Sequence, residues 1–174
     1  MVEKILLDEA ESRSVRTFAE FAEDCVVIPP GGPYEGRYYS MDLQPYTRLF
    51  FRVLDESLRG TGQRFYRIAS VGPTQSGKTL TCLTIPILYH QFELEEDTIY
   101  GVPTLEMAGD KWRRDILPVI QAGEFRRYMP TRGRGAHGGN AQFAGIDFTN
   151  GTSIKAMPAG GGDKQRAGYT ARVL

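Results

Sequence analysis

The chain has 174 residues, of which 41% are apolar, and a formal net charge of zero, which is enough apolar material for one globular domain with a hydrophobic core. Its longest apolar run falls short of the roughly 20 residues that cross a bilayer, and its acidic N-terminus lacks the pattern of a secretory signal. Two cysteines and two histidines argue against a disulfide framework and a zinc cluster, so we expect a cytoplasmic protein without membrane contact.

Residues 1–42 are predicted to form a lead-in to the main domain. Apolar positions at helical spacing predict two short helices within residues 1–28, the second capped by Ser14. Residues 29–39 read PPGGPYEGRYY, and three prolines and three glycines in this stretch are compatible with neither a helix nor a central strand. We interpret this stretch as a linker or a clamp loop.

Residues 43–174 are predicted to form an α/β domain. Its first helix begins near Pro45 and ends before Gly60, with one apolar face made of Tyr46, Leu49, Phe50, Val53 and Leu54. After it, β and α patterns alternate: a strand over 65–71, a helix over 77–90, a strand over 97–104 and a helix over 105–120. Such alternation predicts a mainly parallel sheet with helices on both faces.

A β-hairpin is predicted near residues 145–158. Asn150 and Gly151 stand between two β-rich runs, and this pair is typical of a type I′ turn, which needs positive φ at both central residues. The last residues, YTARVL, resemble the start of one more strand. The sheet is therefore expected to be incomplete at the C-terminus.

The sequence VGPTQSGKT, residues 71–79, contains the phosphate-binding pattern G-x-x-x-x-G-K-[ST]. Its defining residues, Gly72, Gly77, Lys78 and Thr79, stand between a predicted strand and a predicted helix. Backbone N–H groups of the loop, including those at Thr74, Gln75 and Ser76, would surround a polyphosphate, while Pro73 has no N–H. Lys78 would reach the β- and γ-phosphates and the Thr79 hydroxyl would bind Mg²⁺. The alternative is that residues 71–79 form an ordinary Gly-rich turn between a strand and a helix. If they form a phosphate loop, we expect ATP and Mg²⁺ as cofactors.

Two neighbouring segments carry a family resemblance. VPT followed by a helix with Trp112 and Arg113 resembles the segment after the nucleotide site of helicase-like and DNA-translocating ATPases. LQPY resembles the segment that these motors place against adenine, with Gln44 on its edge and Tyr46 stacked on its ring; a helix start with core aromatics is the alternative. From about residue 15 to the end, the order of motifs resembles the N-terminal ATPase part of a lambda-type phage terminase large subunit.

The resemblance implies a RecA/helicase-like P-loop NTPase fold and an ATPase that drives double-stranded DNA into a capsid. It also implies a terminase small subunit and a capsid portal as partners. The chain would assemble into a homo-oligomeric motor located in the cytoplasm of the host cell. Many terminases carry an arginine early in the loop, where Pro73 and Thr74 stand here, so Arg166 is a candidate arginine finger. The chain ends at Leu174, before the acids expected after TARVL, and we expect a truncated ATPase with little activity alone.

Charge is unevenly divided along the chain. Residues 1–110 hold ten Lys/Arg and 17 Asp/Glu, a net charge of −7, and residues 111–174 hold 11 and four, a net charge of +7. The C-terminal part could therefore face DNA through a basic surface, although solvated helix faces are the alternative. This surface would include Trp112, Arg113, Arg114, Arg126, Arg127, Arg132 and Arg134. A helicase-like or restriction-type DNA translocase and a small-molecule P-loop kinase are alternative functions.

Overall fold

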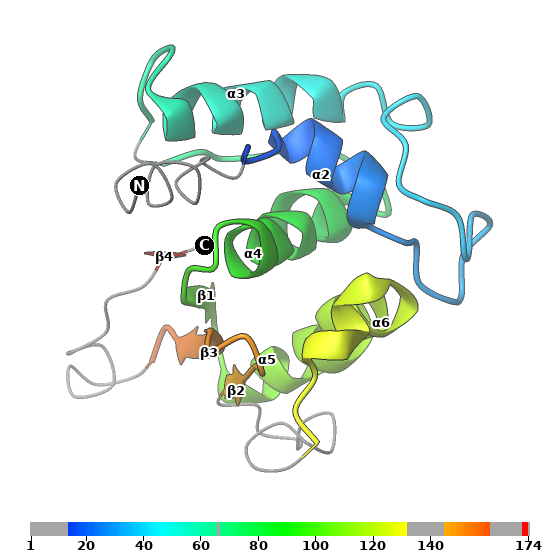
Figure 1. The fold of residues 1–174 in the computed structure, drawn as a ribbon, viewed down its shortest axis with the longest axis vertical. Coiled ribbons are helices and arrows are strands. Elements are labelled where there is room, and N and C mark those ends of the chain that lie inside the picture. Colours follow the sequence, from blue (N-terminus) through cyan, green and yellow to red (C-terminus); the bar gives the residue numbers. More distant parts are fainter. Residues whose placement is uncertain (1–13, 66, 132–144, 161–171, 174) are drawn as a thin grey trace, which may run out of the picture.

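The computed structural model describes residues 14–65, 67–131, 145–160 and 172–173 as a mixed α/β structure (Figure 1). In Figure 1 the helix labelled α4 lies between α2 and α3 on one side and α6 on the other. Among the described helices, none is long and apolar enough to cross a membrane. The first predicted helix, around residues 5–7, falls outside the described residues.

Helix α2 (Phe18–Cys25) begins with a capping box. The Glu20 backbone N–H donates to the Thr17 hydroxyl at 3.2 Å, and the Thr17 backbone N–H donates to the Glu20 carboxylate at 2.8 Å. The two residues therefore satisfy each other's free N–H groups at the start of the helix. The prediction that Ser14 is the cap was wrong, because only Thr17 has an acidic residue three positions ahead that can complete this arrangement.

The Pro/Gly segment forms a closed loop and not an extended linker. Tyr39 N–H donates to Val26 O and Ile28 N–H donates to Arg37 O, both at 2.8 Å. Val27 and Tyr38 form an isolated antiparallel bridge between the same two stretches. The residues between them turn without forming a helix or a central strand, as predicted, and the two ends of the loop are held together.

Helix α3 (Thr47–Arg59) ends where the sequence predicts, since Gly60 adopts a left-handed conformation with φ +67°. The predicted apolar face was partly wrong. Thr47 and Phe51 are buried, whereas Leu49 is 58% exposed. The helix packs against α2, where the rings of Phe18 and Phe51 stack with centroids 6.4 Å apart, and this contact selects the buried face.

The predicted helix after the phosphate loop is present. The chain becomes helical at Lys78 and continues through a π-helical segment (Leu80–Thr84), α4 (Ile85–Leu88) and a second π-helical segment (Tyr89–Glu93). Pro86 lacks an N–H and its ring would crowd the carbonyl four residues earlier. The wider π turn before Pro86 is consistent with that crowding.

The next predicted helix is also present, and again it is interrupted before a proline. It consists of α5 (Leu105–Lys111), a π-helical segment (Trp112–Ile116) and α6 (Leu117–Ala122), with Pro118 in the first turn of α6. The Thr104 hydroxyl caps α5 by accepting the N–H of Met107 at 3.1 Å. A short 3-10 helix (Glu124–Tyr128) follows.

Within the described parts of the chain, the sheet has four strands in the order β2-β3-β1-β4. Strand β1 (Thr98–Val102) pairs in parallel with β3 (Ser153–Pro158) and with β4 (Arg172–Val173), while β2 (Gly145–Asp147) pairs antiparallel with β3. All residues of β1 except Gly101 are buried, as is typical of a strand inside a parallel sheet. The predictions of a strand over 97–104 and of a hairpin near 145–158 are confirmed.

The hairpin turn differs from the predicted type I′ turn. Gly151 has φ +89°, but Asn150 has no positive φ. Gly151 N–H donates to Phe148 O at 3.1 Å, and Phe148 N–H donates to Thr152 O at 2.8 Å. The loop thus has three residues between the closing pair, with glycine in the left-handed position, which is a common alternative hairpin geometry.

The predicted strand before the phosphate loop is wrong for its described residues, 65 and 67–71, which form no strand. They lie exposed, with Val71 at 97%. Phe65 exchanges two hydrogen bonds with the Ser57 hydroxyl of α3, at 3.0 and 3.2 Å. A strand needs a neighbour for its backbone groups, and this segment lies against a helix.

The core is one hydrophobic cluster to which residues on both sides of position 42 contribute. Trp112, Tyr89 and Tyr100 are its largest fully buried side chains. A second group of aromatic rings surrounds Phe92, which stacks on Phe125 with centroids 4.7 Å apart and meets Phe148 edge-on at 5.1 Å. Burial of Trp112 overturns the expectation that it contributes to a DNA-facing surface.

Candidate nucleotide-binding loop

The backbone of residues 72–79 contains two residues in the left-handed region. Gln75 has φ +58° and Gly77 has φ +76°, while Ser76 between them has no positive φ. Left-handed residues are frequent in phosphate-binding loops, where they turn successive backbone N–H groups toward the anion. Gln75 is not a glycine, and a left-handed conformation at such a residue is typical of functional loops.

The Lys78 side chain folds back over the start of this loop. Its Nζ donates to Gly72 O at 2.8 Å, also contacts Pro73 O, and lies 3.4 Å from the Ser76 hydroxyl. The Ser76 hydroxyl in turn donates to Pro73 O at 2.9 Å. The ammonium group is therefore held at the loop by neutral oxygens, which the oxygens of a bound phosphate could replace with a stronger, charge-assisted interaction.

Thr79 lies in the first helical turn after the loop and is partly buried. Among the described residues, no group of three or more His, Cys, Asp or Glu side chains could hold a metal ion. Mg²⁺ in nucleotide sites needs few protein ligands, because phosphate oxygens and water complete its shell. A site with Thr79 as a protein ligand fits that pattern.

The structure brings the LQPY segment against the phosphate loop. The Gln44 amide lies so close to Gly77 that a Cβ built there would be 2.6 Å from Nε2. The Tyr46 hydroxyl donates to the backbone carbonyl of Ser76, and the Tyr46 side chain remains 56% exposed. Gln44 and Tyr46 are about thirty residues from the loop in sequence, so their place beside it is a tertiary contact.

A network of side-chain hydrogen bonds, partly buried, holds the Gln44 side chain in place. The Tyr39 hydroxyl lies 3.4 Å from Gln44 Oε1, 3.0 Å from the Thr47 hydroxyl and 3.4 Å from the Thr81 hydroxyl. The Thr81 hydroxyl also donates to Gln44 Oε1 at 3.3 Å. Burial raises the pKa of Tyr39, which keeps the phenol neutral and able to donate. The network links the LQPY segment to the helix that follows the loop.

Tyr39 and Thr81 belong to no motif in the sequence that indicates a functional role. Thr81 lies two positions after Thr79, but nothing in the sequence distinguishes it from the neighbouring helix residues. Tyr39 follows another tyrosine, and only the folded structure separates the buried Tyr39 from Tyr38, which is 59% exposed. Motif spacing could not bring the two residues together, because the contact between Tyr39 and Thr81 spans 42 positions in sequence.

The predicted basic surface is only partly described. Arg113 and Arg114 are exposed, but Arg113 pairs with Asp110 of its own helix at 2.8 Å. Arg127 similarly pairs with Glu124 at 3.6 Å and lies over the ring of Tyr128. These contacts are typical of solvated helix faces. Arg126 is also exposed, whereas Arg132 and Arg134 lie outside the described residues, as does Arg166, the candidate arginine finger.

Searches of protein-family models, curated proteins and solved structures found no match to this chain. The candidate site consists of the left-handed residues Gln75 and Gly77, the Lys78 ammonium at the start of the loop, and the Gln44 and Tyr46 side chains against it.

Proposed function

We propose that the chain binds ATP with Mg²⁺ at residues 72–79. The observation that carries this proposal is the pair of left-handed residues, Gln75 and Gly77, with the Lys78 ammonium held at the start of the same loop. Lys78 would exchange its carbonyl partners for β- and γ-phosphate oxygens, and the Thr79 hydroxyl would hold Mg²⁺. The bound metal would neutralise phosphate charge.

The base of the nucleotide would lie near Gln44 and Tyr46. Support for this comes from the contact of both side chains with the loop, because a base is tethered to its phosphates and must lie within a short reach of them. The exposed ring of Tyr46 offers a flat surface for stacking. The Gln44 amide has both a donor and an acceptor with which to recognise the edge of adenine.

Scanning fluorimetry with Mg·ATP tests the site. A ligand that binds only the native state stabilises it by about 2.7 kcal/mol at a hundred times its Kd, so the melting temperature should rise. Lys78→Ala should remove this shift. Lys111→Ala, which removes a surface lysine paired with Asp115, should leave it unchanged, and an undiminished shift in Lys78→Ala would rule out the site.

We further propose that this ATP site belongs to a P-loop NTPase of the DNA-packaging kind, coupling hydrolysis to movement of double-stranded DNA into a capsid. Support comes from the resemblance of the motif order and from the succession of phosphate loop, helix, strand β1 and α5. Arg166 would act as the arginine finger. The small terminase subunit, the capsid portal and further copies of the chain would be its partners, in the host cytoplasm.

Duplex DNA binding tests the motor part of the proposal. Binding should be weak, independent of sequence and strongly salt-dependent. In a salt titration by fluorescence anisotropy, the Arg132→Ala/Arg134→Ala variant should lower the slope of log K against log salt by about two units, one for each lost phosphate contact. Absence of DNA binding would instead favour a small-molecule P-loop kinase, which has no need of DNA.

A further inference from the structure

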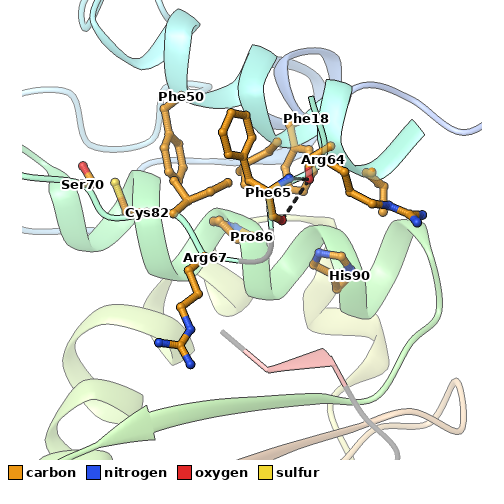
Figure 2. A pocket seen from close by; sticks show the side chains of 13 residues that line it. Phe18, Phe50, Arg64, Phe65, Arg67, Ser70, Cys82, Pro86 and His90 are labelled. Atoms are coloured by element: carbon orange, nitrogen blue, oxygen red, sulfur yellow. Dashed lines mark hydrogen bonds between the residues drawn. The ribbon is translucent and has the colours of Figure 1, made fainter. Parts of the chain in front are cut away.

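A pocket of about 760 Å³ lies between α3, residues 64–70 and the helix that follows the phosphate loop (Figure 2). Its walls combine apolar side chains, including Phe50, Leu54, Leu58, Phe65 and Ile68, with polar ones, including Ser57, Ser70 and His90. Figure 2 shows the rings of Phe50 and Phe65 beside each other, while the guanidinium groups of Arg64 and Arg67 point away from them. Among the described residues that line the pocket, none carries a carboxylate.

We propose that residues 1–13 of the same chain dock into this pocket. The first described residues place the end of that segment beside it. Val15 O accepts a hydrogen bond from Arg59 Nη2 at 2.9 Å, and Ser57 and Leu58, the two residues before Arg59, line the pocket. Phe18 is also one of its lining residues. The point at which residues 1–13 join the described chain therefore lies next to the pocket that they would fill.

The chemistry of the segment complements that of the pocket. Residues 1–13 read MVEKILLDEAESR, with three consecutive aliphatic side chains, Ile5–Leu7, that suit apolar walls. The segment contains four acidic and two basic residues. Arg64 and Arg67 have no ion pair within the described residues, and they could pair with the segment's carboxylates at the rim of the pocket.

The proposed docking would lie close to the phosphate loop. Ser70, another residue that lines the pocket, is two positions before Gly72. Cys82 lines the same pocket from the helix that begins at Lys78. A docked N-terminal segment would therefore hold the chain on both sides of the loop. Docking of residues 1–13 would not require nucleotide to be bound at the loop.

A disulfide test uses the position of Cys82 in the pocket. In the full chain carrying Leu6→Cys, mild oxidation should link the new thiol to Cys82 within one molecule, because a disulfide forms only when the two Cα atoms come within about 7 Å. Peptide mapping by mass spectrometry would identify the bond. Cys82→Ser in the same background should remove it, while the other native thiol, Cys25, is buried.

Charge reversal distinguishes docking from chance collision. In the Leu6→Cys chain, Arg64→Glu/Arg67→Glu should slow formation of the disulfide at least several-fold and speed tryptic cleavage after Lys4 and Arg13. The matched reversal Arg113→Glu/Arg114→Glu, on another exposed helix surface, should change neither rate. Equal rates in the two variants would overturn the proposal. A covalent dimer as the main product would also overturn it, because the segment would then occupy a second copy.

Discussion

At the scale of single residues, Gly77 is the position in the phosphate loop with the least room for change. Its φ is +76°, and a Cβ there would lie 2.6 Å from Gln44 Nε2. Gly77→Ala should therefore lower the free energy of unfolding by at least about 1–2 kcal/mol, the typical cost of a left-handed conformation at a residue with a side chain. It should also displace Gln44 and weaken ATP binding.

Chemical denaturation and the Mg·ATP-induced melting shift would measure both effects of Gly77→Ala. Gly101→Ala is the matched control, because a Cβ at Gly101 would meet nothing within 4 Å. That variant should keep the wild-type melting shift and unfold within about 1 kcal/mol of the wild type. Similar losses in the two variants would show that the contact between Gln44 and Gly77 has no particular importance.

The two cysteines should differ in reactivity. Burial raises the pKa of the Cys25 thiol to about 11, although the nearby Arg16 guanidinium opposes the shift. Because the thiolate is the reactive form, Cys25 should resist iodoacetamide at neutral pH and react appreciably only as the pH approaches 11. Cys82 is partly exposed and should be modified first. Peptide mass spectrometry of native and denatured samples would check the order, and early labelling of Cys25 would contradict it.

At the scale of elements, the start of α2 depends on one side chain. The Thr17 hydroxyl accepts the N–H of Glu20 at 3.2 Å, and loss of such a cap typically costs about 1 kcal/mol. Thr17→Ala should lower the free energy of unfolding by that amount. Ser14→Ala, at the exposed residue that the sequence pattern favours, should have no measurable effect. Denaturant titrations of both variants would decide which residue caps the helix.

At the scale of the whole molecule, Arg16 connects the N-terminal part of the described chain to the end of the long helix after the phosphate loop. Its side chain donates to the buried Glu93 carboxylate from Nε at 3.2 Å and from Nη2 at 2.7 Å, across 77 positions in sequence. The Tyr89 hydroxyl also donates to Arg16 O at 2.7 Å. These contacts hold α2 on the core.

Arg16→Met should lower the free energy of unfolding by roughly 2 kcal/mol, because hydrogen bonds to charged groups contribute about 1.5–3 kcal/mol and Arg16 remains partly exposed. Arg52→Met is the matched control, since Arg52 makes a solvent-exposed pair with Glu56 at 3.9 Å and should cost less than about 0.5 kcal/mol. Denaturant titrations would compare the two variants. Equal values would mean that the long-range pair contributes no more than a surface pair.

Much of the fold could be predicted because it depends on neighbours in sequence. Gly60 ends α3 in the left-handed conformation that glycine adopts most readily, and the helix after Lys78 follows its apolar pattern. The β-rich pattern of residues 97–104 likewise identifies β1. The order of glycines and lysine in residues 72–78 predicts a phosphate loop, and that function stays a prediction.

The sequence by itself thus determined the end of α3 at Gly60, the presence of the hairpin and the loop motif, because each depends on backbone preferences and residue periodicity over a few positions. Tertiary structure decided which face of α3 is buried, that Trp112 lies in the core, and that residues 67–71 form no strand. It also placed Gln44 against Gly77 and Tyr39 beside Thr81. These outcomes depend on which distant segments pack together, and local backbone preference carries no information about such partners.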